Sequence, residues 1–170
     1  MSQLDIVVAA DEAWGIGKNE QIPWRLPGDM RWFKELTCTQ EPVGTLSIVI
    51  MGRKTWDSIP DRFRPLPGRL NVVVSRNPTL ALPEGVRLAS SVAEALEKSA
   101  GGRVFCIGGG EIYRSAMEMP TCRRIYLTRV FGQFECDTFF QEPGPEWTLS
   151  PLRESTEENG TRYDMALLTR

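Results

Sequence analysis

Short apolar runs that alternate with helix-like segments place the strongest constraint on the fold of this chain. Each run has the length of a single strand and is too short for a buried helix. Nearly every position in a run is apolar, which is typical of strands covered on both faces of a sheet. The runs occupy residues 4–10, 46–51, 70–74 and 103–107. Strands of this kind, separated by helices, predict an α/β fold with a mostly parallel sheet.

The segments between these runs predict helices, and the last segments predict a hairpin. Ser91 followed by Glu94 has the spacing of a capping box at a helix start. Apolar stretches at 147–152 and 161–168 predict an antiparallel edge, with the acidic stretch 154–160 as its tip. Helices are expected at 29–37, 53–59, 91–99 and 111–117, and further strands at 86–89 and 124–130.

Two longer segments are expected to be loops, namely the polar stretch 11–21 and the proline- and arginine-rich stretch 60–69. Long loops in compact domains are usually lids or binding loops. The sequence contains no repeat, linker or low-complexity tract. We therefore predict one α/β domain, residues 1–170, with a central mostly parallel sheet of about eight strands, an antiparallel C-terminal edge hairpin and about four short flanking helices.

The composition excludes several classes of function. The net charge of −2 gives no electrostatic reason to expect a nucleic-acid partner. No apolar run approaches the length of a membrane span, and no basic-then-apolar leader begins the chain, so we expect a cytoplasmic protein without a membrane partner. Histidine is absent, which excludes Ser-His-Asp and Cys-His catalysis and imidazole metal sites. The four cysteines form no C-x-x-C pair, so we expect reduced thiols and no metal.

Asp29 is the most conspicuous candidate for chemistry because it is a single acid among bulky apolar neighbours. Pro27 and Gly28 interrupt the chain, and a helix is expected to begin at Asp29. Asp29 and Phe33 are four residues apart, so the carboxylate and the ring should share one helix face. One interpretation is a carboxylate that caps or charges a helix N-terminus. The other is a carboxylate at the floor of an apolar cleft, facing a flat ligand that forms hydrogen bonds.

Three consecutive glycines, Gly108 to Gly110, stand between a predicted strand and a predicted helix. Glycines at such a point let the backbone approach a pyrophosphate at the helix N-terminus. The segment is not a dinucleotide-binding fingerprint, because Tyr113 occupies the position of the third glycine. Gly17-Lys18 is not a phosphate-binding P-loop either, because Asn19 follows it. The interpretations that remain are nucleotide binding and a plain turn.

Basic residues follow two further strands. Arg53 and Lys54 come after the second run, and Arg76 comes after the third, each beside a hydroxyl residue. Taken singly they are solvated surface charges, but jointly they indicate an anionic cofactor with a separate terminal phosphate. Arg69 follows a proline-stiffened stretch and could clamp a substrate carboxylate, or it could again be a surface arginine.

These segments together resemble dihydrofolate reductase, because they occur in that family's order and cover nearly the whole chain. The matching segments are Gly15–Asn19, Pro23-Trp24, Leu26-Pro27, Asp29, Phe33, Val49–Trp56, Ser58–Pro60, Arg64–Arg69, Val74–Arg76, Ile107–Gly110, Tyr113, Leu127–Arg129 and Asp137–Phe140. The resemblance implies reduction of 7,8-dihydrofolate to tetrahydrofolate with NADPH, in one-carbon metabolism. It also implies a monomer with a small-molecule substrate, a mobile loop at 11–21, and a cis peptide between Gly108 and Gly109.

The resemblance further implies roles for individual residues. Asp29 would accept hydrogen bonds from the pterin, Thr128 would hydrogen-bond Asp29, and Trp24 would help hold a water; these are the implied catalytic residues. The implied substrate-binding residues are Val7, Val8, Ile22, Met30, Phe33, Ile59, Leu66 and Arg69, the last for the glutamate α-carboxylate. The implied cofactor-binding residues are Ala9, Ile16, Gly17, Gly52, Arg53, Lys54, Thr55, Val74, Ser75, Arg76, Ile107, Gly108, Gly109, Gly110, Glu111, Ile112 and Tyr113.

Two alternatives stay open on the sequence. One is another pyridine-nucleotide reductase of the same fold, such as that of riboflavin synthesis, which would have no reason for an Asp29–Thr128 pair. The other is a non-enzymatic folate- or nucleotide-binding module. We expect the apolar neighbours of Asp29 to raise its pKa above the ordinary value, because burial disfavours the charged form.

Overall fold

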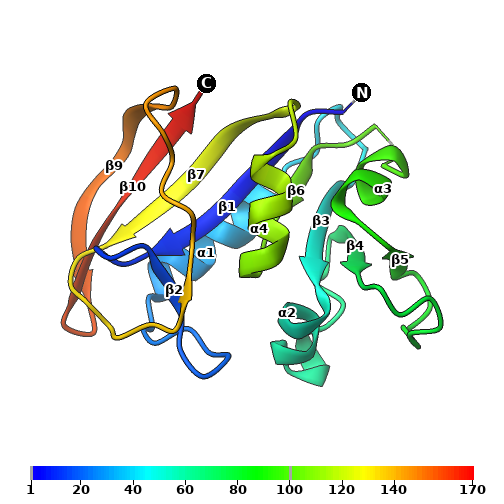
Figure 1. The fold of residues 1–170 in the computed structure, drawn as a ribbon, viewed down its shortest axis with the longest axis horizontal. Helices are drawn as coiled ribbons and strands as arrows, with labels where there is room; N and C mark the ends of the chain where they lie inside the picture. The colour runs from blue at the N-terminus through cyan, green and yellow to red at the C-terminus, as the bar shows by residue number, and fades with distance from the viewer. Residues whose placement is uncertain (1, 100) are drawn as a thin grey trace.

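The computed structural model describes residues 2–99 and 101–170. A central eight-stranded sheet runs in the order β5-β4-β3-β6-β1-β7-β10-β9 (Figure 1). Its strands are β1 (Leu4–Ala10), β3 (Ser47–Gly52), β4 (Arg69–Val74), β5 (Arg87–Ala89), β6 (Val104–Cys106), β7 (Cys122–Val130), β9 (Thr148–Glu158) and β10 (Thr161–Thr169). All pairs from β5 to β7 are parallel, whereas β10 is antiparallel to both β7 and β9. The predicted fold class is confirmed.

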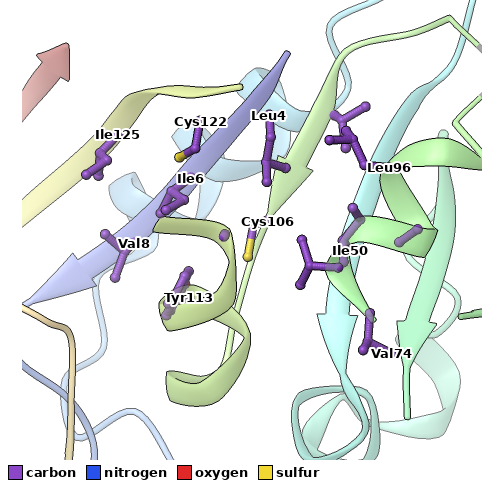
Figure 2. Close-up of a cluster of buried hydrophobic side chains, with 14 of the residues drawn as sticks. Leu4, Ile6, Val8, Ile50, Val74, Leu96, Cys106, Tyr113, Cys122 and Ile125 are labelled. Atoms are coloured by element: carbon purple, nitrogen blue, oxygen red, sulfur yellow. The ribbon is translucent and has the colours of Figure 1, made fainter. Parts of the chain in front are cut away.

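Helices cover both faces of the sheet, as the apolar runs predicted. They are α1 (Pro27–Thr37), α2 (Arg53–Ser58), α3 (Val92–Glu97) and α4 (Gly110–Met117), with a 3-10 turn at Asp61–Phe63. Along β1, Ile6 and Val8 pack with α3 and α4, whereas Val7 packs with α1 and α2 on the opposite face. This alternation follows from the two-residue period of a strand. Figure 2 shows the first of these clusters, with Ile6 and Val8 beside Tyr113 of α4.

Some boundaries differ from the predictions for local physical reasons. Helix α1 begins at Pro27, two residues before the predicted start, because proline has no N–H to satisfy in the first helical position. Strand β9 continues to Glu158, so the hairpin tip is only Asn159 and Gly160, both with positive φ. Such a pair forms the tight turn that matches strand twist. Predicting a tip at 154–160 was therefore wrong.

The predicted loop at 11–21 contains a short strand that the sequence did not reveal. Strand β2 (Gly15–Gly17) pairs antiparallel with β8 (Thr138–Phe139) beside the main sheet. A Cβ on Gly15 would lie 2.4 Å from Cβ of Cys136, so this approach requires glycine. Three residues are too few for an alternating pattern to be visible.

The capping prediction for α3 is confirmed in its first half. The Ser91 hydroxyl accepts from the Glu94 backbone N–H at 3.0 Å, but the Glu94 carboxylate accepts from Ser90 rather than from Ser91. The helix ends at Glu97, before the predicted end at residue 99.

The four cysteines are free thiols. Within residues 2–99 and 101–170, no helix combines the length and the apolar character needed to cross a bilayer.

Candidate active site

The carboxyl ends of the parallel strands bring the predicted cofactor-binding segments together. Gly52 ends β3 opposite Val74, the last residue of β4. Its backbone N–H donates to the Gly108 carbonyl at 2.8 Å, which joins the end of β3 to the glycine turn after β6. Ligands of open α/β sheets bind at this edge. The structure therefore gathers at one edge the residues that the sequence had placed in separate motifs.

The glycine turn before α4 is buried at Gly108 and half-buried at Gly109 and Gly110. The peptide between Gly108 and Gly109 is cis, as predicted. Gly108 has φ +117°, and a Cβ there would lie 3.2 Å from the Tyr113 ring. Gly109 precedes α4 and provides no side-chain cap for the first turn. Free N–H groups at a helix N-terminus suit an anion, so this turn fits the pyrophosphate of a dinucleotide cofactor.

The predicted phosphate-binding basic residues have exposed side chains, and their ion pairs lie at the surface. Arg53 is exposed, and its Nε lies 3.5 Å from the Asp57 carboxylate one helical turn away. Lys54 Nζ lies 3.9 Å from the Glu20 carboxylate, and Arg76 is exposed. Exposed charges of this kind are mobile and strongly screened by salt.

Tyr113 lies beneath the glycine turn rather than on its surface. Its hydroxyl donates to the Val7 carbonyl at 2.7 Å, and its ring packs edge-on against Phe140. Burial raises its pKa well above the ordinary value. Tyr113 therefore connects α4 to β1 and supports the turn from below.

The Asp29 carboxylate is paired with the Thr128 hydroxyl, as predicted. Thr128 lies in β7, and its Oγ1 donates to Asp29 Oδ1 at 2.6 Å. Burial raises the pKa of Asp29, the Thr128 hydrogen bond lowers it, and the charge of Glu158 raises it further. The predicted direction of the shift is confirmed. Asp29 is the third residue of α1 and makes no cap, so a capping role is wrong, but it does place a negative charge in the first helical turn.

Apolar side chains surround this part of α1 to different degrees. Trp24 is buried and packs edge-on against Phe134. Phe33, Ile59 and Leu66 are partly buried against the cluster on the α1 face of the sheet. Ile22 and Met30 expose 64% and 66% of their surface. Met30 follows Asp29 directly in α1, and exposed large apolar side chains of this kind are what a binding cleft would offer to a flat ligand.

Arg69 is fixed by its neighbours, unlike the other arginines of the site. It begins β4 and is buried, with its Nε donating to the Pro67 carbonyl at 2.9 Å. Its Nη1 donates to the Thr37 hydroxyl at 3.0 Å. Burial lowers its pKa, but an arginine still keeps its charge at neutral pH. Nη2 has no hydrogen-bond partner among the described residues, which leaves a directed donor for a carboxylate.

Asp11 is an important residue that the sequence analysis overlooked. It is buried directly after β1, and its Oδ1 accepts from the N–H groups of Ala13 and Gly15. Its Oδ2 accepts from the Phe134 N–H at 3.0 Å. Asp11 thus anchors the base of the 11–21 loop to the segment that precedes β8. An acid that immediately follows an apolar strand was the available signal.

The sheet edge, the glycine turn and the half-buried carboxylate are typical of α/β enzymes that bind a nucleotide cofactor beside a polar heterocycle. The family model described as dihydrofolate reductase matches residues 3–170, so the chain belongs to the dihydrofolate reductase family. That family reduces dihydrofolate to tetrahydrofolate with NADPH. The predicted membership of this family is confirmed.

Individual relatives agree with this assignment. The chain is 42% identical over 177 residues to the bifunctional dihydrofolate reductase-thymidylate synthase of Glycine max, covering 97% of this chain and 33% of that protein. It thus spans about one third of the length of that relative. It is 42% identical to the dihydrofolate reductase of Heliothis virescens, covering 82% of this chain and 80% of that protein. The solved dihydrofolate reductase of Schistosoma mansoni superposes with a TM-score of 0.85 at 32% identity, covering 99% of this chain and 98% of that one.

Proposed function

We propose that this chain itself reduces 7,8-dihydrofolate to tetrahydrofolate, with Asp29 as the residue that recognises and orients the pterin. The observation that supports this most directly is the 2.6 Å hydrogen bond from Thr128 to Asp29 in a half-buried position. A family relative with another substrate would have no reason to keep a carboxylate held in this way.

Asp29 offers the acceptors that a pterin requires. The pterin edge presents two adjacent donors, N3–H and the 2-amino group. An ionised carboxylate accepts from both, whereas an amide accepts from one and opposes a donor to the other. Thr128 donates to Oδ1 and fixes the orientation of the carboxylate plane. Trp24 is buried in the cluster that contains Leu26, the residue before α1, and would help to hold a water beside this carboxylate.

The remaining residues are proposed to hold the ends of the two ligands. Arg69 would bind the glutamate α-carboxylate of the substrate through its unused donors, and Leu66 would pack on the aminobenzoyl ring. Arg53, Thr55, Ser75 and Arg76 would bind the cofactor phosphates, the last two at the 2′-phosphate. The glycine turn and the first N–H groups of α4 would contact the pyrophosphate.

NADPH, when bound, supplies the hydride that forms the new C–H bond at pterin C6. N5 must also gain a proton, and the chain has no histidine that could donate one. Asp29 would contact the opposite edge of the pterin ring, away from N5. We therefore propose that a solvent water reaches N5 when the 11–21 loop permits it. A pre-steady-state reduction step that does not slow in deuterated solvent would contradict this route.

One assay separates the proposed reaction from its alternatives. Purified protein with NADPH and dihydrofolate should show a substrate-dependent loss of the reduced-nicotinamide absorbance. A related reductase would oxidise NADPH only with a different heterocycle, such as a pyrimidine of riboflavin synthesis. A binding module would bind NADPH without any substrate-dependent loss.

We also propose that residues 1–170 act as a single-domain cytoplasmic monomer without nucleic-acid or membrane partners. The net charge of −2 and the absence of an apolar span in the sequence support this proposal. Sedimentation of the active protein at several concentrations tests it, since a mass above that of one chain would contradict the monomer.

A further inference from the structure

Helix α1 has no local cap at its N-terminus. The N-cap residue is Leu26, whose side chain cannot accept a hydrogen bond, and Pro27 follows it. The Gly28 N–H therefore needs an acceptor from elsewhere. Glu158, at the end of β9, provides it through Oε1 at 2.9 Å, from 130 residues further along the chain. A carboxylate at this position also complements the positive end of the helix.

The Glu158 carboxylate is itself held in place by the hairpin. The buried Tyr163 of β10 donates its hydroxyl to the same Oε1 at 2.5 Å. The approach depends on glycine, because a Cβ on residue 28 would lie 2.5 Å from the Tyr163 hydroxyl and 2.8 Å from Glu158 Oε1. Hydrogen bonds from Tyr163 and Gly28 lower the pKa of Glu158, so it is ionised at neutral pH.

Glu158 thus fixes the backbone immediately before Asp29. We propose that Glu158 is a positioning residue for the Asp29 carboxylate, which it orients through Gly28 and influences electrostatically through its negative charge. This inference rests on the proposed role of Asp29 as the pterin-binding carboxylate. Glu158 would act from the edge hairpin, without contacting either ligand.

Several groups from different elements determine the protonation of Asp29. Thr128 of β7 stabilises the charged form by its hydrogen bond, whereas Glu158 of β9 opposes it. The hydroxyls of Tyr163 on β10 and Tyr113 on α4 also face the Asp29 charge and are neutral at neutral pH. The positive charge of Arg31 on α1 lowers the pKa of both Glu158 and Tyr163. Glu158 is therefore the one like charge identified as raising the Asp29 pKa among the described residues.

Three variants separate the two parts of this role. Glu158→Gln keeps an oxygen that accepts from both Gly28 and Tyr163 but removes the charge. Glu158→Ala removes the charge and the acceptor. Glu157→Gln is the matched control, since it removes the same charge from an exposed neighbour on β9 that has no hydrogen bond to α1 among the described residues.

The primary measurement is the Asp29 pKa, obtained by NMR titration of protein carrying 13C-carboxyl aspartate, without cofactor or substrate. The Asp29 resonance is assigned as the one missing from Asp29→Asn. We expect Glu158→Gln to lower the Asp29 pKa and Glu157→Gln to leave it close to the wild-type value, because nearby charge acts more strongly than screened surface charge. An equal pKa in both Gln variants would overturn the electrostatic part of the proposal.

The second measurement is kcat/KM for dihydrofolate near neutral pH. We expect kcat/KM of Glu158→Ala to be about three- to ten-fold lower than kcat/KM of Glu158→Gln, which is the range for a lost helix cap. Circular dichroism of both variants confirms that they fold. Equal activity in the two variants would overturn the positioning part. Full activity of Asp29→Asn would instead refute the proposed function, and the NMR titration would still report on Glu158.

Discussion

The two halves of the candidate site are built differently. On the substrate side, Asp29 accepts a hydrogen bond from Thr128 and Arg69 donates one to Thr37, and both partners are distant in the sequence. On the cofactor-phosphate side, Arg53 and Arg76 are exposed, and Arg53 has only a surface ion pair. The first half is organised before a ligand arrives, whereas the second must be ordered by the ligand.

This difference has an energetic consequence. A buried, oriented charge interacts strongly with a ligand, and its removal leaves other polar groups unpaired. An exposed charge lies in a high dielectric, so each of its contacts with a ligand contributes little binding free energy. Added salt screens this contribution further. We therefore expect substitutions on the substrate side to have larger effects than substitutions of the phosphate-binding arginines.

The largest expected effect is that of Asp29→Asn on reduction. An asparagine satisfies one of the two pterin donors and opposes the other, so we expect a loss of about 10²–10⁴ in kcat/KM. Its residual activity should rise as pH falls, because more substrate then arrives already protonated. Single-turnover hydride transfer with deuterated cofactor, measured across pH for both forms, checks this. Near wild-type rates at neutral pH would show that Asp29 takes no part in the chemistry.

Arg69→Lys should have the next largest effect, on substrate binding alone. Lysine cannot keep the bonds to Pro67 and Thr37 while also offering a planar fork to a carboxylate. We expect KM for dihydrofolate to rise about ten- to a hundred-fold, the equivalent of one charged hydrogen bond, with KM for NADPH unchanged. A dihydropterin without the glutamate tail provides the control, since both forms should reduce it equally. A similar loss with that compound would show that Arg69 acts through the fold instead.

How far the sequence predicted this arrangement depends on the range of the interactions. Apolar runs and local caps are encoded nearby, so β1, the sheet class and the Ser91 cap were predictable. The pairing of Asp29 with Thr128 came only from the family resemblance, because no local pattern links residues 99 positions apart. The anchoring by Asp11 and the remote cap from Glu158 were missed for the same reason. Each of these carboxylates forms a hydrogen bond with a residue far away in the sequence, and no local sequence pattern predicts such a contact.

The phosphate side offers a smaller effect that sharpens the contrast. We expect Arg76→Ala and Arg53→Ala each to reduce the NADPH-to-NADH ratio of kcat/KM by about 1.5- to five-fold, the range for exposed charge pairs. The reduction should shrink as salt is added, whereas the Arg69→Lys defect should persist. Measuring kcat/KM for both cofactors at low and high ionic strength tests both statements. An unchanged ratio in both variants would remove these arginines from the phosphate site.

The smallest expected effect is on stability, and its sign distinguishes a buried carboxylate from an exposed one. Burial raises the Asp29 pKa above its ordinary value of 3.8, so the folded chain binds this proton more tightly than the unfolded chain. Wild-type stability should therefore decline as pH rises from 3.8 through the raised pKa, and Asp29→Asn should avoid that decline.

The exposed Asp137 is the opposite case, because the Asn19 N–H lowers its pKa. Its contribution is present above 3.8 and is lost as pH falls through the lowered pKa, so Asp137→Asn should be less stable at neutral pH. Urea unfolding of the three proteins over a pH series checks both signs. If Asp29→Asn were less stable than wild type at neutral pH, the carboxylate would be held for folding, and the substrate side would not be an organised site maintained at a cost in stability.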